Sequence, residues 1–268
     1  MSGTHLDSTE MARLIEENLS AKSTDFARLD GGSLHTGNPT WFMSNLKRSA
    51  YNGVTLACFS PDRLDEQIES SLEPFRENAI PLTWWVGPLS EPATLGRALQ
   101  SHGFIHVRDM TGMAARLDDL VECPPLASEY SFEPVPDRVA LEKWLPLFME
   151  TFGLPADDAE LISDVFAHLS FSSDANWRHY FIQSHGQVLA TGSLHLGGGV
   201  AGLYNIATRP EHRQHGLGRA ITLLIYEQAR QMGYTLGTLQ TTYPNALRLY
   251  HRIGFEVYCK IGMYQRTW

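Results

Sequence analysis

Two glycines and a group of basic side chains lie close together between residues 209 and 219, where they can bind an anion. The basic members are Arg209, His212, Arg213, His215 and Arg219, and only Glu211 opposes them. Gly216 and Gly218 let the backbone approach a ligand closely and turn several N–H groups toward one point. Because this positive cluster occurs in a chain of formal net charge -9, we predict a site for a phosphate-bearing ligand.

The residues around the two glycines exclude two common phosphate-binding patterns. A P-loop requires Lys and then Ser or Thr after its last glycine, whereas Arg219 and Ala220 follow Gly218. A dinucleotide fingerprint requires a third glycine, and Ile221 occupies that position. The remaining pattern is Arg-x-x-Gly-x-Gly. On two glycines alone, a turn without any ligand is an equal alternative.

The segments on either side of this loop must position it. The apolar run from Leu203 to Ala207 predicts a buried strand. After Arg219, apolar residues recur at helical spacing, and Gly233 is a helix-stop signal. The helical positions are Ile221, Leu224, Ile225 and Gln228. A helix that begins at the loop would direct the positive end of its dipole toward the anion.

Composition limits the class of protein. The chain has 268 residues, of which 43% are hydrophobic and 19% charged, as in one large or two ordinary globular domains. It has no apolar run of 18 residues, and its first residues are acidic and amphipathic rather than a secretory signal. The three cysteines are too scattered for a disulfide framework. We therefore expect a cytoplasmic protein without membrane partners.

Charge and histidine spacing argue against two further classes of ligand. The net negative charge disfavours nucleic acid as a partner, because binding to phosphate backbones requires a broad basic face. The eleven histidines contain no His-Glu-x-x-His pattern, so we predict no metal site. The sequence does not indicate an oligomeric state.

A linker at residues 120–130, with adjacent prolines and no periodicity, predicts two domains, residues 1–122 and 128–268. We expect an α/β fold with a mixed sheet. In the first domain, helices are predicted at 1–22, 63–78 and 92–102, and strands at 54–59, 82–86 and 104–113. In the second, strands are predicted at 131–136, 177–183, 187–196, 203–207, 235–241 and 255–263, and helices at 139–152, 156–169, after the loop, and at 245–252.

A weak internal echo connects the two halves. Leu95-x-x-Ala98-Leu99-x-x-x-Gly103-Phe104 has the spacing of Ala246-x-x-Leu249-Tyr250-x-x-x-Gly254-Phe255. In both, a helix is expected to end in Gly-Phe and to lead into a strand, which suggests a degenerate duplication. A chance similarity of Leu-rich helices is an equal alternative. In the first half, Leu99 replaces Tyr250, and no glycine pair follows the strand at 54–59.

Residues 128–268 resemble the GNAT superfamily of N-acetyltransferases. The resemblance depends on Pro-x-x-Arg-x-x-Gly-x-Gly at 210–218, followed by the Ala246 to Phe255 motif in the family's order. It implies a GNAT acyltransferase fold, with a degenerate GNAT-like domain in residues 1–122. It also implies acetyl-CoA as co-substrate, bound by Asn205, Ile206, Ala207, Arg213, Gln214, His215, Gly216, Leu217, Gly218 and Arg219. Asn245 is a further candidate, offset by two residues from the family's Asn, with helix capping as the alternative.

In the resemblance, Tyr250 is the general acid that protonates the departing thiolate, and a backbone N–H near Ile206 or Ala207 is the oxyanion donor. Some family members carry a Glu that acts as the general base on the strand before the loop, but residues 200–207 contain no carboxylate. Two alternatives remain for removing the amine proton. Tyr204 or His195 can act as the base through a water molecule, or the amine can bind already neutral. The resemblance also implies that the strands at 203–207 and 235–241 splay apart to admit the acetyl group.

The resemblance predicts an N-acetyltransferase that moves an acetyl group directly to a primary amine of unknown identity. Asp157, Asp158 and Glu160 can attract a cationic amine or simply favour a helix N-terminus, the second being the commoner role. Trp41, Phe42, Trp84 and Trp85 can line an acceptor groove or form core. A sensor or interaction module that binds acyl-CoA without turnover is the alternative function, and acyl-chain length stays open.

Overall fold

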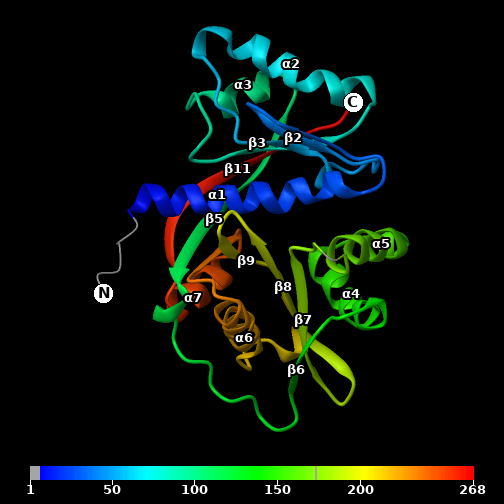
Figure 1. Cartoon of the computed structure of the whole chain (residues 1–268), viewed down its shortest axis with the longest axis vertical. Coiled ribbons are helices and arrows are strands. Elements are labelled where there is room, and N and C mark those ends of the chain that lie inside the picture. Colours follow the sequence, from blue (N-terminus) through cyan, green and yellow to red (C-terminus); the bar gives the residue numbers. More distant parts are fainter. Residues whose placement is uncertain (1–6, 173) are drawn as a thin grey trace. The chain divides into compact units, whose positions relative to one another are not determined.

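The computed structural model of the chain describes residues 7–172 and 174–268 (Figure 1). The chain forms two compact units. The first consists of residues up to Met113 together with Gln240–Tyr243 and Val257–Trp268. The second consists of Ala114–Leu239 and Pro244–Glu256. The C-terminal segment thus belongs to the unit that is built mainly from the first half of the chain.

In the first unit, the sheet order is β1-β2-β3-β4-β11-β5. These strands are β1 Ser33–Thr36, β2 Thr40–Met43, β3 Gly53–Thr55, β4 Leu82–Val86, β5 Ile105–Arg116 and β11 Glu256–Arg266. Helices are α1 Ser8–Thr24, α2 Leu64–Glu77 and α3 Leu95–Ser101. β3 and β4 are parallel, whereas β11 pairs with β4 antiparallel. The sheet is therefore mixed, as predicted.

In the second unit, the sheet order is β10-β9-β8-β7-β6. Its strands are β6 Ser131–Pro134, β7 Trp177–Ser184, β8 Gln187–Gly197, β9 Val200–Thr208 and β10 Leu236–Thr241. Its helices are α4 Arg138–Phe152, α5 Ala159–Ser170, α6 Leu217–Gln231 and α7 Pro244–Ile253. β9 and β10 are parallel and the other neighbours antiparallel. Figure 1 shows α4 and α5 on one side of β7 and β8, with α6 on the other.

Each unit has its own apolar core. In the first unit, Trp84 is fully buried among side chains of α2, α3 and β4, and Phe42 and Trp85 are buried as well. These three aromatics are therefore core residues, the commoner of the two predicted roles. In the second unit, Trp144 and Phe148 of α4 and Phe166 of α5 pack with Phe181 of β7. Burial of this apolar surface is the main stabilising term of both units.

The two segments with the repeated spacing, which end in Gly103-Phe104 and Gly254-Phe255, also have the same local structure. The N–H of Phe104 donates to the carbonyl of Leu99, and the N–H of Phe255 donates to the carbonyl of Tyr250, both at 3.0 Å. Gly103 and Gly254 both have positive φ, which glycine adopts without steric cost. The same helix end therefore occurs twice, before β5 and before β11.

Some local predictions were incomplete. β1 and β2 were not predicted, because Gly37 and Pro39 mark their connection as loop. The strand at 54–59 is only three residues long, and Ser60 makes no side-chain cap. Glu16 of α1 is 1% exposed and accepts the N–H of Leu89 at 2.7 Å, although acidic residues of an amphipathic helix are usually solvated. Residues 1–6 of the predicted helix at 1–22 lie outside the described residues.

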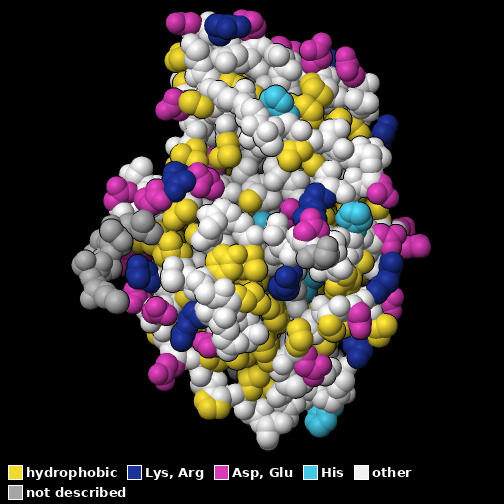
Figure 2. Space-filling view, viewed as in Figure 1, with side chains coloured by type: hydrophobic (Ala, Val, Ile, Leu, Met, Phe, Trp, Pro, Cys, Tyr) yellow, Lys and Arg dark blue, Asp and Glu magenta, His cyan; other side chains and the backbone are white. Residues whose placement is uncertain are grey.

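On the face shown in Figure 2, acidic and basic side chains are interspersed, and that face carries no continuous basic patch. Among the residues that the structure describes, no helix is long and apolar enough to cross a membrane. Within the same residues, no group of three or more His, Cys, Asp or Glu side chains can hold a metal ion.

Candidate active site

The loop with the two glycines connects β9 to the first turn of α6, as the sequence predicts. Gly216 is the N-cap residue of α6, with φ 83°, and no side chain caps the helix. The first amide N–H groups of α6 therefore have no side-chain acceptor at their cap. A Cβ added to Gly216 would meet no atom within 4 Å, so the space beside this N-cap residue is open.

Basic side chains surround this helix N-terminus in two roles. His215 and Arg219 are exposed and available to a ligand. Arg209 and the exposed Arg213 also fix the loop, because their Nε atoms donate to the carbonyls of Val188 at 2.7 Å and Thr208 at 3.1 Å. Gln214 has φ 65°, a left-handed conformation that turns the backbone at the middle of the loop. The local charge and the uncapped N–H groups fit a diphosphate.

β9 separates from β10 next to the loop. Residues Ala201 to Leu203 of β9 pair with Gly237 to Leu239 of β10, whereas pairing between β9 and β8 continues to Thr208. Residues 204–208 thus keep β8 on one side and have no β10 partner on the other. This is the splayed geometry that the sequence resemblance implies. An extended chain can add to β9 here by backbone hydrogen bonds.

A β-bulge marks the point of separation. Thr191 of β8 lies opposite Ala207, but Ser193 lies opposite Tyr204, so β9 contains one extra residue. Asn205 has φ 55°, which Asn tolerates better than most residues. The bulge changes the direction of the backbone N–H and carbonyl groups of Asn205, Ile206 and Ala207, the residues predicted to contact the cofactor.

Three tyrosines lie near the separated strand ends. Tyr250 of α7 is 6% exposed, and its ring lies 6.1 Å from that of Phe255. The Tyr226 hydroxyl donates to the carbonyl of Thr238 on β10 at 2.9 Å. Burial raises the pKa of Tyr226, and the nearby hydroxyls of Tyr250 and Tyr204 raise it further. These three side chains are therefore close enough to interact electrostatically.

Tyr250 has the properties of a proton donor. Burial raises the pKa of Tyr250 well above its ordinary value, so the phenol stays protonated at neutral and moderately alkaline pH. A buried phenol that stays protonated can donate its proton to a ligand that enters beside it.

Tyr204 and Asn245 differ in their fit to the prediction. Tyr204 lies on β9 beside the bulge, with its ring 5.7 Å from Trp177 and 6.4 Å from His195. Asn245 is the second residue of α7, so it does not hold the N-cap position suggested as its alternative role. It is exposed and accepts a hydrogen bond from Arg248.

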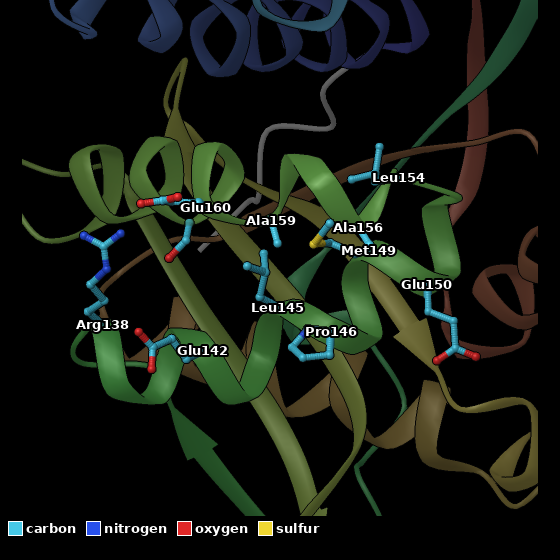
Figure 3. Close-up of a pocket in the computed structure, with 11 residues that line it drawn as sticks. Arg138, Glu142, Leu145, Pro146, Met149, Glu150, Leu154, Ala156, Ala159 and Glu160 are labelled. Carbon is cyan, nitrogen blue, oxygen red and sulfur yellow. The ribbon is translucent and has the colours of Figure 1, made fainter.

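The segment with Asp157, Asp158 and Glu160 contributes Ala156, Ala159 and Glu160 to the lining of a groove between α4 and α5 (Figure 3). The groove has a volume of about 700 Å³ and is lined mainly by apolar side chains such as Leu145 and Met149. Figure 3 shows Arg138, Glu142 and Glu160 at one end and Glu150 at the other. Asp157 and Asp158 precede α5, where negative charge favours the helix N-terminus.

Sequence reasoning missed the buried polar residues behind the bulge. His179 of β7 is 1% exposed and lies between Ser170 Oγ, 2.8 Å from its Nε2, and Ser193 Oγ, 2.7 Å from its Nδ1. The alternation of polar residues in β7 and β8 gives no signal that distinguishes these side chains from solvated ones. Tyr226 was missed because it lies within an apolar helical pattern.

Comparison with known proteins agrees with this geometry. Residues 141–255 match the model of the Acetyltransferase (GNAT) family. Residues 141–255 are a GNAT domain. No curated protein sequence matches the chain. The matched range contains both the glycine loop and Tyr250, which therefore occur in the segment that the family model describes.

Solved structures extend the fold similarity over both halves of the chain. A GCN5-related N-acetyltransferase from Kribbella flavida is 18% identical, with a TM-score of 0.75 over 95% of each chain. A functionally unknown conserved protein from Staphylococcus epidermidis gives 12% identity and a TM-score of 0.67, over 88% of this chain and 94% of that one. A tandem GNAT protein from the clavulanic acid biosynthesis pathway is 14% identical, with a TM-score of 0.60 over 100% of this chain and 97% of that one. The chain therefore shares the fold of these proteins over most of its length.

Proposed function

We propose that this protein is an acetyl-CoA-dependent N-acetyltransferase that transfers an acetyl group directly to a primary amine within a ternary complex. The observation that carries the proposal is the end of β9 and β10 pairing at Leu203 and Leu239, beside the uncapped N-terminus of α6. One open strand edge and one anion site are thus adjacent, as a nucleotide-linked thioester requires.

In this proposal, the N–H groups at the start of α6 and the exposed Arg213 and Arg219 bind the diphosphate of acetyl-CoA. The backbone of Asn205, Ile206 and Ala207 pairs with the pantetheine arm. An N–H of residue 206 or 207 donates to the thioester oxygen as negative charge develops there.

Tyr250 supplies the proton that the thiolate sulfur takes when the carbon–sulfur bond breaks. The acceptor nitrogen forms the new carbon–nitrogen bond and gives its proton to water, and solvent restores the Tyr250 proton. Tyr204 and His195 are the side chains beside the bulge that can order such a water. We propose the cytoplasm as the compartment, where acetyl-CoA and reduced thiols occur together.

A second function, acyl-CoA sensing without turnover, is favoured by one observation. Residues 200–208 of β9 contain no Asp or Glu that could serve as a base. Thermal unfolding with acetyl-CoA, followed by release of free thiol with a mixture of primary amines, separates the two functions. A raised midpoint with amine-dependent thiol release supports transfer, whereas a raised midpoint without release supports sensing. An unchanged midpoint of the folded protein contradicts both.

A further inference from the structure

A continuous row of polar side chains crosses the second unit from α5 to the bulge of β9. Ser170 lies at the end of α5, His179 on β7, Ser193 on β8 and Asn205 on β9. His179 contacts both serines, and Asn205 Nδ2 donates to Ser193 Oγ at 3.0 Å. Four elements are thus linked by three hydrogen bonds that end at the extra residue of the bulge.

The row lies in an apolar environment. His179 is enclosed by the rings of Trp144, Phe166 and Trp177, with centroid distances of 4.9, 5.1 and 5.8 Å. A polar group in such surroundings is costly unless it is hydrogen-bonded, and both imidazole nitrogens have partners. Loss of the Ser193 contact would leave the buried His179 Nδ1 without its partner, which favours the observed arrangement.

The bulge needs such support. A residue with positive φ within a strand is disfavoured relative to extended backbone, even for Asn. Two contacts from β8 hold Asn205 in this conformation: Ser193 Oγ accepts its side-chain N–H, and Thr191 Oγ1 donates to its carbonyl at 3.4 Å. The side chain and the backbone of Asn205 are therefore both tied to β8.

We propose that Ser193 and His179 are positioning residues that hold the β9 bulge, and through it the backbone of Ile206 and Ala207, in the conformation that receives the acetyl group. This inference rests on the proposed function for the identity of the ligand. Neither side chain needs to touch the substrate, because both act through Asn205.

Ser193→Ala tests the inference by removing only the central hydroxyl, and Asn205→Gly cuts the row at its other end while allowing positive φ. Ser163→Ala is the matched control. Ser163 is a buried serine of α5 whose Oγ has no hydrogen-bond partner, so its truncation removes the same atom without breaking the row.

The first readout needs no ligand. Hydrogen exchange of the segment 203–209 should become at least tenfold faster in Ser193→Ala and Asn205→Gly, but not in Ser163→Ala. The second readout is kinetic: kcat should fall at least tenfold in both variants, while the Kd for CoA, bound mainly at the glycine loop, should change less than twofold.

Exchange and kcat in Ser193→Ala equal to those in Ser163→Ala would overturn the inference. A parallel loss of CoA affinity and stability in Ser193→Ala would also overturn it, since the row would then be a general structural element. If the wild-type protein does not bind CoA, the proposed function fails, and the exchange comparison still decides whether the row holds the bulge.

Discussion

His179 Nδ1 lies 2.7 Å from Ser193 Oγ in the interior of the second unit, where the imidazole is fully enclosed. Burial lowers the pKa of His179 to about 3, and the positive charge of Arg178 acts in the same direction. The folded protein therefore keeps this side chain neutral over the whole physiological range. Protonation of His179 would turn its acceptor nitrogen into a donor and so break one hydrogen bond of the row from Ser170 to Asn205.

This relationship predicts acid sensitivity of the second unit. An unfolded histidine titrates near pH 6.5, so between about pH 6.5 and 3 the unfolded state binds one more proton than the folded state. The unfolding free energy should fall as pH falls below 6.5, by at most about 1.4 kcal/mol per pH unit from this group. Urea unfolding between pH 4.5 and 7.5 measures the slope. His179→Gln should be less stable at pH 7.5 but should lose this part of the slope, and an unchanged slope would contradict the assignment.

Glu16 predicts the opposite pH dependence for the first unit. Burial raises the pKa of Glu16 to about 7, although the N–H of Leu89 and the Ser90 hydroxyl oppose the shift. Between about pH 4.5 and 7 the folded state binds the extra proton, so stability should fall as pH rises through this window. Glu16→Gln should raise the unfolding free energy at pH 8 by on the order of 1–3 kcal/mol. Equal unfolding free energies of Glu16→Gln and the wild type at pH 8 would show that burial of the ionised Glu16 carboxylate does not destabilise the folded protein.

Tyr250→Phe should separate catalysis from cofactor binding. The ring remains and only the hydroxyl is removed, so stability and the Kd for acetyl-CoA should be nearly unchanged. Turnover should fall by roughly 10²-fold or more, as expected for loss of a general acid. Tyr234→Phe, after the C-terminal end of α6, is the control and should keep the wild-type rate. A wild-type rate in Tyr250→Phe would eliminate Tyr250 as the proton donor.

Gly218→Ala should weaken the cofactor without damaging the fold. A Cβ at this position meets Thr208 Oγ1 at 3.5 Å and Leu249 Cδ1 at 3.8 Å, which are ordinary contacts. Because alanine also favours helix, the thermal midpoint should stay the same or rise slightly. Calorimetry should nevertheless show at least fivefold weaker binding of CoA, since the methyl group narrows the approach of the diphosphate to the N–H groups of α6. Unchanged affinity would place the diphosphate elsewhere.

Local sequence signals predicted the second half of the chain well. The glycine loop and α6 with its stop at Gly233 both depend on backbone requirements that only a few residue types satisfy. The two α4 and α5 helices follow from apolar spacing, as confirmed by their buried faces. The position of Tyr250 came from the family motif rather than from periodicity.

Other features depend on contacts between distant residues and left no local signal. The positive φ of Asn205 cannot be read from Tyr-Asn-Ile within a strand, and the row from Ser170 to Asn205 requires four separate elements to meet. The burial of Glu16 likewise depends on the backbone at Leu89, 73 positions further along the chain. Tertiary context decided these cases.

The C-terminal strand β11 depends on the first half of the chain for its pairing partner. Its residues Gly262 to Arg266 pair with β4, a strand encoded some 180 positions earlier, and Val257–Trp268 belongs to the first unit. A fragment that starts at the linker would carry this strand without its partner and expose a bare edge to self-association. Although the first half has no glycine pair after its β3 strand and has Leu99 in place of Tyr250, it is structurally necessary, because its strand β4 pairs with the C-terminal strand β11.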